Sequence, residues 1–187
     1  MYIWTGFVLD KEDELFIRNT CKEVNKKYGL NELSFTLPQH ISLKTSFYSD
    51  NYLEVIHFIK SILSNFSSFS VNVIGISKIN NGVIWLDIEE NEILRNIHNL
   101  LNDELLAKYT ISLIKFDGEA FKFHSTLFQD SSITDEHNSL IIELSQHFHF
   151  PMKLTIHKVS IGISEVGGLG TFKVFDTIEL KGGIVDG

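Results

Sequence analysis

The order of expected secondary-structure elements repeats along this chain of 187 residues. A strand, a helix and a hairpin occur in the first half and again in the second half. Alternating apolar residues predict the strands, and apolar residues three and four positions apart predict the helices. The repeat indicates an α+β fold of two pseudo-symmetric lobes, each an antiparallel or mixed sheet with helices on its outer face, enclosing a central cleft.

Both lobes belong to one predicted domain covering residues 1–187, because no linker rich in Pro, Gly or Ser separates them. We place one lobe at about residues 30–90 and the other at about 115–181, closed by the N-terminal strand and helix. The Asn80-Asn81-Gly82 segment is a hairpin turn signal between two predicted strands. The expected helices cover residues 10–28, 50–65, 91–108 and 134–148, and the expected strands cover residues 2–9, 37–47, 69–79, 83–88, 121–128, 152–164 and 171–180.

A strand in each half carries a histidine followed two residues later by a hydroxyl side chain. The first motif holds His40 and Ser42 in the sequence His-Ile-Ser-Leu, and the second holds His124 and Thr126 in the sequence His-Ser-Thr-Leu. Successive side chains on a strand point to opposite faces, so the histidine and the hydroxyl of each motif share one face. If a pseudo-twofold axis relates the lobes, these two faces meet across the cleft.

Two imidazoles and two hydroxyls on one cleft suit the cleavage of a phosphodiester. One neutral histidine can take a proton from the attacking water or hydroxyl, and the other, protonated, can give a proton to the departing oxygen. The hydroxyls of Ser42 and Thr126 can donate hydrogen bonds to the non-bridging phosphate oxygens. Because side chains fill both roles, this chemistry needs no metal and no other cofactor. We interpret His40 and His124 as the catalytic pair, and the sequence leaves open which of them is the base.

Three neighbouring side chains are candidate substrate contacts. Lys44 shares the predicted face of His40, and Lys122 and Phe128 share that of His124. The lysines could add positive charge beside a phosphate, and Phe128 could stack on a base. The alternative for each lysine is a solvated position at a strand edge, and the alternative for Phe128 is a place in the core.

The paired motifs resemble those of the 2H phosphoesterases, which include 2′-5′ RNA ligase-like proteins and cyclic phosphodiesterases. That family carries two His-x-Ser/Thr motifs on strands of two related lobes, and positions 40 and 124 are 84 residues apart, a spacing like the family's. Ser125 departs from the family pattern, because an apolar residue is usual there. The resemblance implies a metal-independent phosphodiesterase or, in some members, a ligase, acting on 2′,3′-cyclic phosphate ends or 2′-5′ linkages.

Composition limits the partners and the compartment. The formal net charge of −8 disfavours long nucleic acid, because non-specific binding needs many contacts between basic side chains and phosphates. We therefore expect a small nucleotide or short oligonucleotide as the partner, and we favour a monomer. The single cysteine, Cys21, cannot form an internal disulfide, and the sequence shows neither a secretory leader nor an apolar run of the ~20 residues that span a bilayer. These features predict a cytoplasmic protein without a membrane partner.

Two other functions remain open from the sequence. The cleft could bind a nucleotide without turnover, as a sensor or sponge, although a pure binder would gain more from arginine than from paired histidines. An RNA end-joining enzyme also fits the motifs, and the negative charge disfavours it. The candidate substrates are 2′,3′-cyclic phosphate RNA ends, 2′-5′ oligoadenylates, ADP-ribose cyclic phosphate and cyclic oligonucleotide signals.

Other residues with potential chemistry favour structural roles. His147, His149 and His157 invite a zinc interpretation, but no cluster of Cys or carboxylates accompanies them. His98 lies on a predicted helix and is expected at the surface. The glycine-rich segment 167–170 connects two predicted strands, so it lacks the helix N-terminus that binds phosphate and is interpreted as a hairpin loop.

Overall fold

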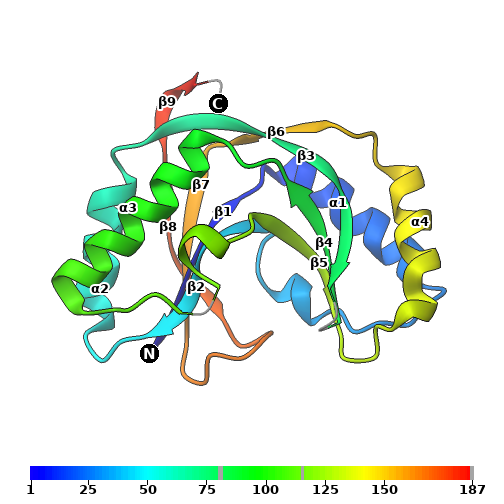
Figure 1. Cartoon of the computed structure of the whole chain (residues 1–187), viewed down its shortest axis with the longest axis horizontal. Coiled ribbons are helices and arrows are strands. Elements are labelled where there is room, and N and C mark those ends of the chain that lie inside the picture. Colours follow the sequence, from blue (N-terminus) through cyan, green and yellow to red (C-terminus); the bar gives the residue numbers. More distant parts are fainter. Residues whose placement is uncertain (80–81, 115, 186–187) are drawn as a thin grey trace.

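The chain folds into two β-sheets with helices packed at their sides (Figure 1). The computed structural model describes residues 1–79, 82–114 and 116–185. One sheet has the strand order β2-β1-β7-β8, and the other has the order β5-β4-β3-β6, with β9 parallel to β3. The strands are β1 (Tyr2–Val8), β2 (His40–Tyr48), β3 (Ser67–Ile79), β4 (Val83–Ile88), β5 (His124–Gln129), β6 (Met152–Ile156), β7 (Lys158–Ser164), β8 (Lys173–Glu179) and β9 (Lys181–Val185).

The helices lie in two pairs on opposite sides of the sheets, α2 against α3 and α1 against α4 (Figure 1). In α2, Val55, Ile56, Ile59 and Leu63 are buried at three- and four-residue spacing, so one apolar face packs inward. Within the described residues, no helix combines the length and the apolar character needed to cross a membrane. The helices are α1 (Lys11–Asn25), α2 (Tyr52–Leu63), α3 (Glu92–Tyr109) and α4 (Asn138–His147), with short 3₁₀ turns η1 (Leu33–Thr36), η2 (Gly118–Ala120) and η3 (Asp135–His137).

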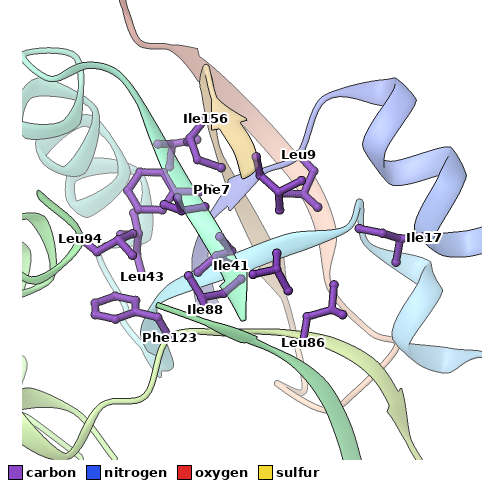
Figure 2. Close-up of a cluster of buried hydrophobic side chains, with 14 of the residues drawn as sticks. Phe7, Leu9, Ile17, Ile41, Leu43, Leu86, Ile88, Leu94, Phe123 and Ile156 are labelled. Atoms are coloured by element: carbon purple, nitrogen blue, oxygen red, sulfur yellow. The ribbon is translucent and has the colours of Figure 1, made fainter. Parts of the chain in front are cut away.

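One hydrophobic core joins the two sheets. Figure 2 shows Phe7 and Ile41 of the first sheet in one cluster with Leu86 and Ile88 of the second, and all of them are buried. Burial of this apolar surface is the main stabilising contribution, at roughly 25 cal/mol per Å² removed from water. The shared core makes the two lobes one body, and the expected α+β architecture is confirmed.

The two sheets are arranged alike, but they do not follow the two halves of the sequence. Strands β2 and β5, which carry the motifs, are the edge strands of their sheets, and their neighbours are β1 and β4. The hairpin β3–β4 pairs with β5, and β7–β8 joins β1 and β2. The predicted lobe at about 30–90 is therefore divided between both sheets, and the N-terminal strand lies with the first motif. Alternation of apolar residues predicts that a segment is a strand, but it does not predict its partner.

Two segments differ from the expected boundaries or lie outside the described residues. The single strand expected at 152–164 is two strands, β6 in one sheet and β7 in the other, with a break at His157. The expected turn residues Asn80 and Asn81 lie outside the described residues. The strands on either side of them, β3 and β4, pair antiparallel as a hairpin requires.

Candidate active site

The two motif strands show the alternation expected from the sequence. His40 and Ser42 on β2 are half-buried, whereas Ile41 and Leu43 between and after them are fully buried. On β5, the same pattern makes His124 and Thr126 half-buried and places Ser125 in the interior. In each motif, the histidine and the hydroxyl therefore share the face that solvent can reach.

Ser125 joins the two motifs directly. Its Oγ donates to the His40 carbonyl oxygen at 2.7 Å and accepts from Gln39 Nε2 at 2.7 Å. Gln39 Nε2 also donates to the Thr126 carbonyl oxygen at 2.9 Å. The serine that departs from the family pattern thus has a structural reason, because a hydroxyl bridges two edge strands where an apolar side chain could not.

Both histidines are oriented by the same backbone contact. The Nδ1 atom of His40 lies 2.7 Å from the Pro38 carbonyl oxygen, and Nδ1 of His124 lies 2.7 Å from the Lys122 carbonyl oxygen. A carbonyl oxygen only accepts, so Nδ1 carries a proton and donates it in each ring. Nε2 is then the nitrogen of each ring that can accept or deliver a proton.

A tryptophan from the neighbouring strand packs against each histidine. Trp4 on β1 meets the His40 ring edge-on at 4.4 Å between centroids, and its Nε1 donates to Ser42 Oγ at 3.3 Å. Trp85 on β4 stacks on His124 at 4.1 Å and donates to Asp87 Oδ1 at 2.8 Å. Trp4 and Asp87 lie outside both motifs, so the sequence does not reveal their positions beside the histidines. Knowledge of the strand order would identify both residues, because Trp4 lies on the strand next to the first motif and Asp87 lies on the strand next to the second.

Glycines make room for the first tryptophan. A Cβ atom at Gly6 would lie 2.4 Å from the Trp4 ring, and one at Gly162 would lie 2.9 Å from it. Both distances are far below van der Waals contact, so any side chain at Gly6 or Gly162 would displace the indole. The close approach of three neighbouring strands, β2, β1 and β7, thus fixes Trp4 beside His40.

The two histidines differ in how readily they accept a proton. Burial, together with the positive charges of His124 and Arg18, lowers the pKa of His40 to about 4, against the opposing effect of the Pro38 carbonyl. Burial also lowers the pKa of His124, but the Lys122 carbonyl and the Asp87 carboxylate oppose this shift. Strands β2 and β5 contact each other, and the Ser125–His40 hydrogen bond joins the two motifs. His124 therefore has a carboxylate that favours its protonated form, and His40 has a guanidinium that disfavours it.

Comparison with known families decides what kind of protein has this arrangement. Residues 22–168 match the sequence pattern of the 2′-5′ RNA ligase superfamily. The chain belongs to this superfamily. Both motifs lie inside the matched segment, and the resemblance to the 2H phosphoesterases is confirmed, so the protein is a phosphoesterase of this class. A search of curated protein sequences finds no match.

Solved structures share the whole fold. TT0787 of Thermus thermophilus is 17% identical and covers 97% of this chain and 99% of its own, with a TM-score of 0.69. E. coli LigT complexed with 3′-AMP is 14% identical and covers 95% of this chain and 97% of its own, with a TM-score of 0.61. Usb1 of Kluyveromyces marxianus is 15% identical and covers 96% of this chain and 98% of its own, with a TM-score of 0.51. At these identities, the likeness shows a common fold.

Lys44 is not at the surface of this superfamily member, and the expectation of a substrate contact there is wrong. It is 1% exposed, and its Nζ donates to Asp117 Oδ2 at 2.5 Å and to Asn102 Oδ1 at 2.7 Å. The cause is a β-bulge, because Gly6 pairs with Ser42 while the preceding Thr5 pairs with Lys44. The extra residue rotates β2 and turns Lys44 into the interior.

The expectation that Phe128 contacts the substrate is also wrong, and the cause is again a β-bulge. Lys122, in contrast, is exposed as expected. In the second sheet, Trp85 pairs with Thr126 while Ile84 pairs with Phe128, so a bulge follows the second motif as it follows the first. Phe128 is fully buried and packs near Phe35 of η1 at 5.8 Å between centroids, so it is a core residue. Lys122 lines a surface cavity beside His124, and its role toward a substrate remains a proposal.

His98 is fully buried, and the expectation of a surface position is wrong. Its Nε2 accepts from the Gly118 backbone N–H at 3.0 Å, so Nδ1 carries the proton and donates to the Leu43 carbonyl at 2.6 Å. The ring therefore links α3, β2 and the segment before the second motif. Among residues 1–79, 82–114 and 116–185, no cluster of His, Cys, Asp or Glu could hold a metal ion, including at His147, His149 and His157.

Proposed function

We propose that this phosphoesterase hydrolyses a phosphodiester in a small cyclic nucleotide or a short oligonucleotide, with His40 as general base and His124 as general acid. The observation that carries the proposal is the matched pair of Nδ1–carbonyl contacts. They leave Nε2 of both rings for proton transfer on two strands that Ser125 joins. The proposed roles differ because burial lowers the pKa of His40 to about 4, whereas the carboxylate of Asp87, paired with His124 across the strands, opposes the lowering at His124.

The reaction divides into two proton movements. His40 Nε2 accepts a proton from a water molecule, and the water oxygen forms a bond to phosphorus. The bond from phosphorus to the leaving oxygen breaks, and His124 Nε2–H gives its proton to that oxygen. The proton gained by His40 and the proton lost by His124 balance, and both rings recover by exchange with solvent.

Ser42 and Thr126 are proposed to hold the phosphate. Trp4 Nε1 donates to the Ser42 oxygen, so the hydroxyl hydrogen of Ser42 can point toward a phosphate oxygen. Thr126 is two residues beyond His124 on the same face of β5, and its hydroxyl is proposed to act alike. Such donors stabilise the negative charge that grows on the non-bridging oxygens in the transition state.

A small substrate is supported by what related structures hold. One LigT structure contains 3′-AMP, and another contains phosphate. The net charge of −8 on this chain is unfavourable for long nucleic acid. We therefore propose nucleotides and short oligonucleotides with a 2′,3′-cyclic phosphate or a 2′-5′ linkage as the substrate class.

The decisive experiment is a turnover panel on the purified protein. We expect hydrolysis of at least one of four candidates, namely a 2′,3′-cyclic nucleotide, a 2′-5′ oligoadenylate, ADP-ribose cyclic phosphate and a cyclic oligonucleotide, followed by chromatography. Activity should persist in EDTA, because the proposed roles are filled by side chains. Binding of a candidate without cleavage would contradict the proposal and indicate a sensor or sponge. Joining of RNA ends instead of cleavage would indicate the ligase function.

The pH dependence tests the assignment of base and acid. His40, with its pKa of about 4, is neutral above that pH, whereas His124, with its pKa lowered from 6.5, loses its proton as the pH rises toward neutrality. We expect kcat/KM to be highest between these limits, on the acidic side of pH 6.5, and to fall as the pH rises. Asp87→Asn should move the alkaline limb to lower pH, because it removes the carboxylate that favours protonated His124. An alkaline limb that Asp87→Asn leaves in place would contradict the assignment.

A further inference from the structure

A cavity of about 510 Å³ is lined in part by residues that contact His124. Its wall includes Trp85, which stacks on the His124 ring. The wall also includes Lys122, whose carbonyl oxygen contacts His124 Nδ1. Small-molecule sites commonly measure roughly 300–1,000 Å³, so the volume suits a nucleoside. The cavity therefore adjoins the ring that we propose delivers a proton to the leaving oxygen.

The lining is aromatic and apolar for the most part. Six of the ten lining residues are apolar, among them Trp85, Phe121 and Phe123, which are themselves nearly buried. Phe121 packs against both Phe123 and His98. These contacts fix the two phenylalanine rings, so this wall of the cavity is preformed. A flat heterocycle gains from such a wall by burying both apolar area and its π-face.

The charged groups of the lining select against phosphate. Asp87, Glu90 and Glu119 carry negative charge, and Lys122 is the one basic residue among the lining residues. Arg95 pairs with Glu90, and Asp87 accepts bonds from Trp85 and from Ser77. Glu119, on the exposed turn η2, offers a carboxylate at the rim. Carboxylates accept hydrogen bonds and never donate them, so the complementary ligand group is an N–H donor.

We propose that this cavity receives the nucleobase of the substrate, and that it prefers a base with an exocyclic amino group. The inference rests on the proposed function and refines its substrate class. The phosphate would lie at the two motifs and the base against Trp85 and Phe121. The amino group would face the acidic rim around Glu119, in place of a carbonyl oxygen that carboxylates would repel.

Nucleosides without phosphate test the cavity independently of catalysis. The chain has 2 tryptophans, so its indole N–H groups give two NMR signals, which a Trp4→Phe variant assigns. Cytidine and uridine are the matched probes, because cytidine carries a 4-amino group and an unprotonated N3 where uridine carries a carbonyl oxygen and an N3–H. We expect cytidine to shift the Trp85 signal, to leave the Trp4 signal in place, and to bind about tenfold more tightly than uridine, as one charge-assisted hydrogen bond provides. Equal affinities, or a shift of the Trp4 signal alone, would overturn the proposal.

Two variants at the rim refine the test. Glu119→Gln should reduce the preference for cytidine at least threefold, whereas Glu12→Gln, a matched change on the exposed surface of α1, should leave it unchanged. Ala120→Trp should fill the cavity and weaken binding of either nucleoside about tenfold, whereas Leu106→Trp on the exposed surface of α3 should not. Unchanged binding in both rim variants would place the nucleosides elsewhere.

Turnover separates this inference from the proposed function. The substrate pair is cytidine 2′,3′-cyclic phosphate and a base-free methyl riboside 2′,3′-cyclic phosphate. We expect Ala120→Trp to lower kcat/KM for the cytidine compound about tenfold and to leave the base-free compound unchanged. Equal wild-type turnover of both compounds would overturn the cavity proposal alone. Selective cytidine binding at Trp85 without turnover of any substrate would overturn the proposed function alone.

Discussion

Replacing either His40 or His124 by Ala is expected to lower turnover by at least ~10²-fold, the usual lower contribution of one acid or base. In the proposed mechanism each ring supplies one of the two proton transfers, so loss of either ring removes a step that the other does not perform. Steady-state hydrolysis of the best substrate from the panel measures the effect. His57→Ala is the matched control, since His57 is an exposed histidine on α2.

The histidine variants must remain folded for this result to be informative. Asn is the second replacement at each site, because its amide can donate to the Pro38 or Lys122 carbonyl as Nδ1 does, while it carries nothing in place of Nε2. We expect the Asn variants to be as inactive as the Ala variants and to keep the circular dichroism of the wild type. Wild-type turnover in a folded double variant would disprove the two-histidine mechanism.

Lys44→Met is expected to lower the free energy of unfolding by about 3–5 kcal/mol, as loss of one partner of a buried ion pair typically does. Lys44 Nζ lies 2.5 Å from Asp117 Oδ2, and the two side chains are 1% and 0% exposed. The variant would leave the carboxylate buried without its counter-ion. The carboxylate would still accept hydrogen bonds from the backbone N–H groups of Thr45 and Ile114. Urea unfolding measures the loss.

An exposed ion pair provides the control for Lys44. Lys26 lies 2.5 Å from Glu23 at the surface, and Lys26→Met should change the free energy of unfolding by about 0–1 kcal/mol. The free energy of unfolding should also depend on pH through Asp117. Burial raises the pKa of Asp117, but its bonds from Lys44 and two backbone N–H groups outweigh this and hold the pKa below its usual value. The stability from this group is thus present above the unfolded pKa of about 3.8 and is lost as the pH falls through the lower folded value. A Lys44→Met variant as stable as the wild type would show that the pair does not stabilise the fold.

The pairing of each histidine with a hydroxyl on one strand face could be predicted because it is encoded locally. A histidine and a hydroxyl two residues apart on a strand share one face, whatever the rest of the chain does. His40 with Ser42, and His124 with Thr126, could therefore be paired without any knowledge of which strands neighbour them. The helices could also be predicted, since three- and four-residue spacing of apolar residues is a property of the segment itself.

The features that depend on strand pairing became visible only in the three-dimensional fold. Contacts between distant segments determine which strands share a sheet. They also determine which side chains lie beside each histidine. Trp4 and Asp87 reach the site in this way, from β1 and from β4. Long-range pairing is fixed by the packing of the whole core, and no local pattern in the sequence reports it.

The two bulges mark where local inference stops. Strict alternation places Lys44 with His40 and Phe128 with His124, but one extra residue in each strand rotates both side chains inward. Lys44 then pairs with Asp117 and Phe128 joins the core, because burial of each is stabilised by a partner brought from elsewhere in the chain. Local sequence patterns were enough to identify the residues that could perform the chemistry. The fold decided which of their neighbours reach the site, because a bulge depends on the strand opposite and not on the strand that carries it.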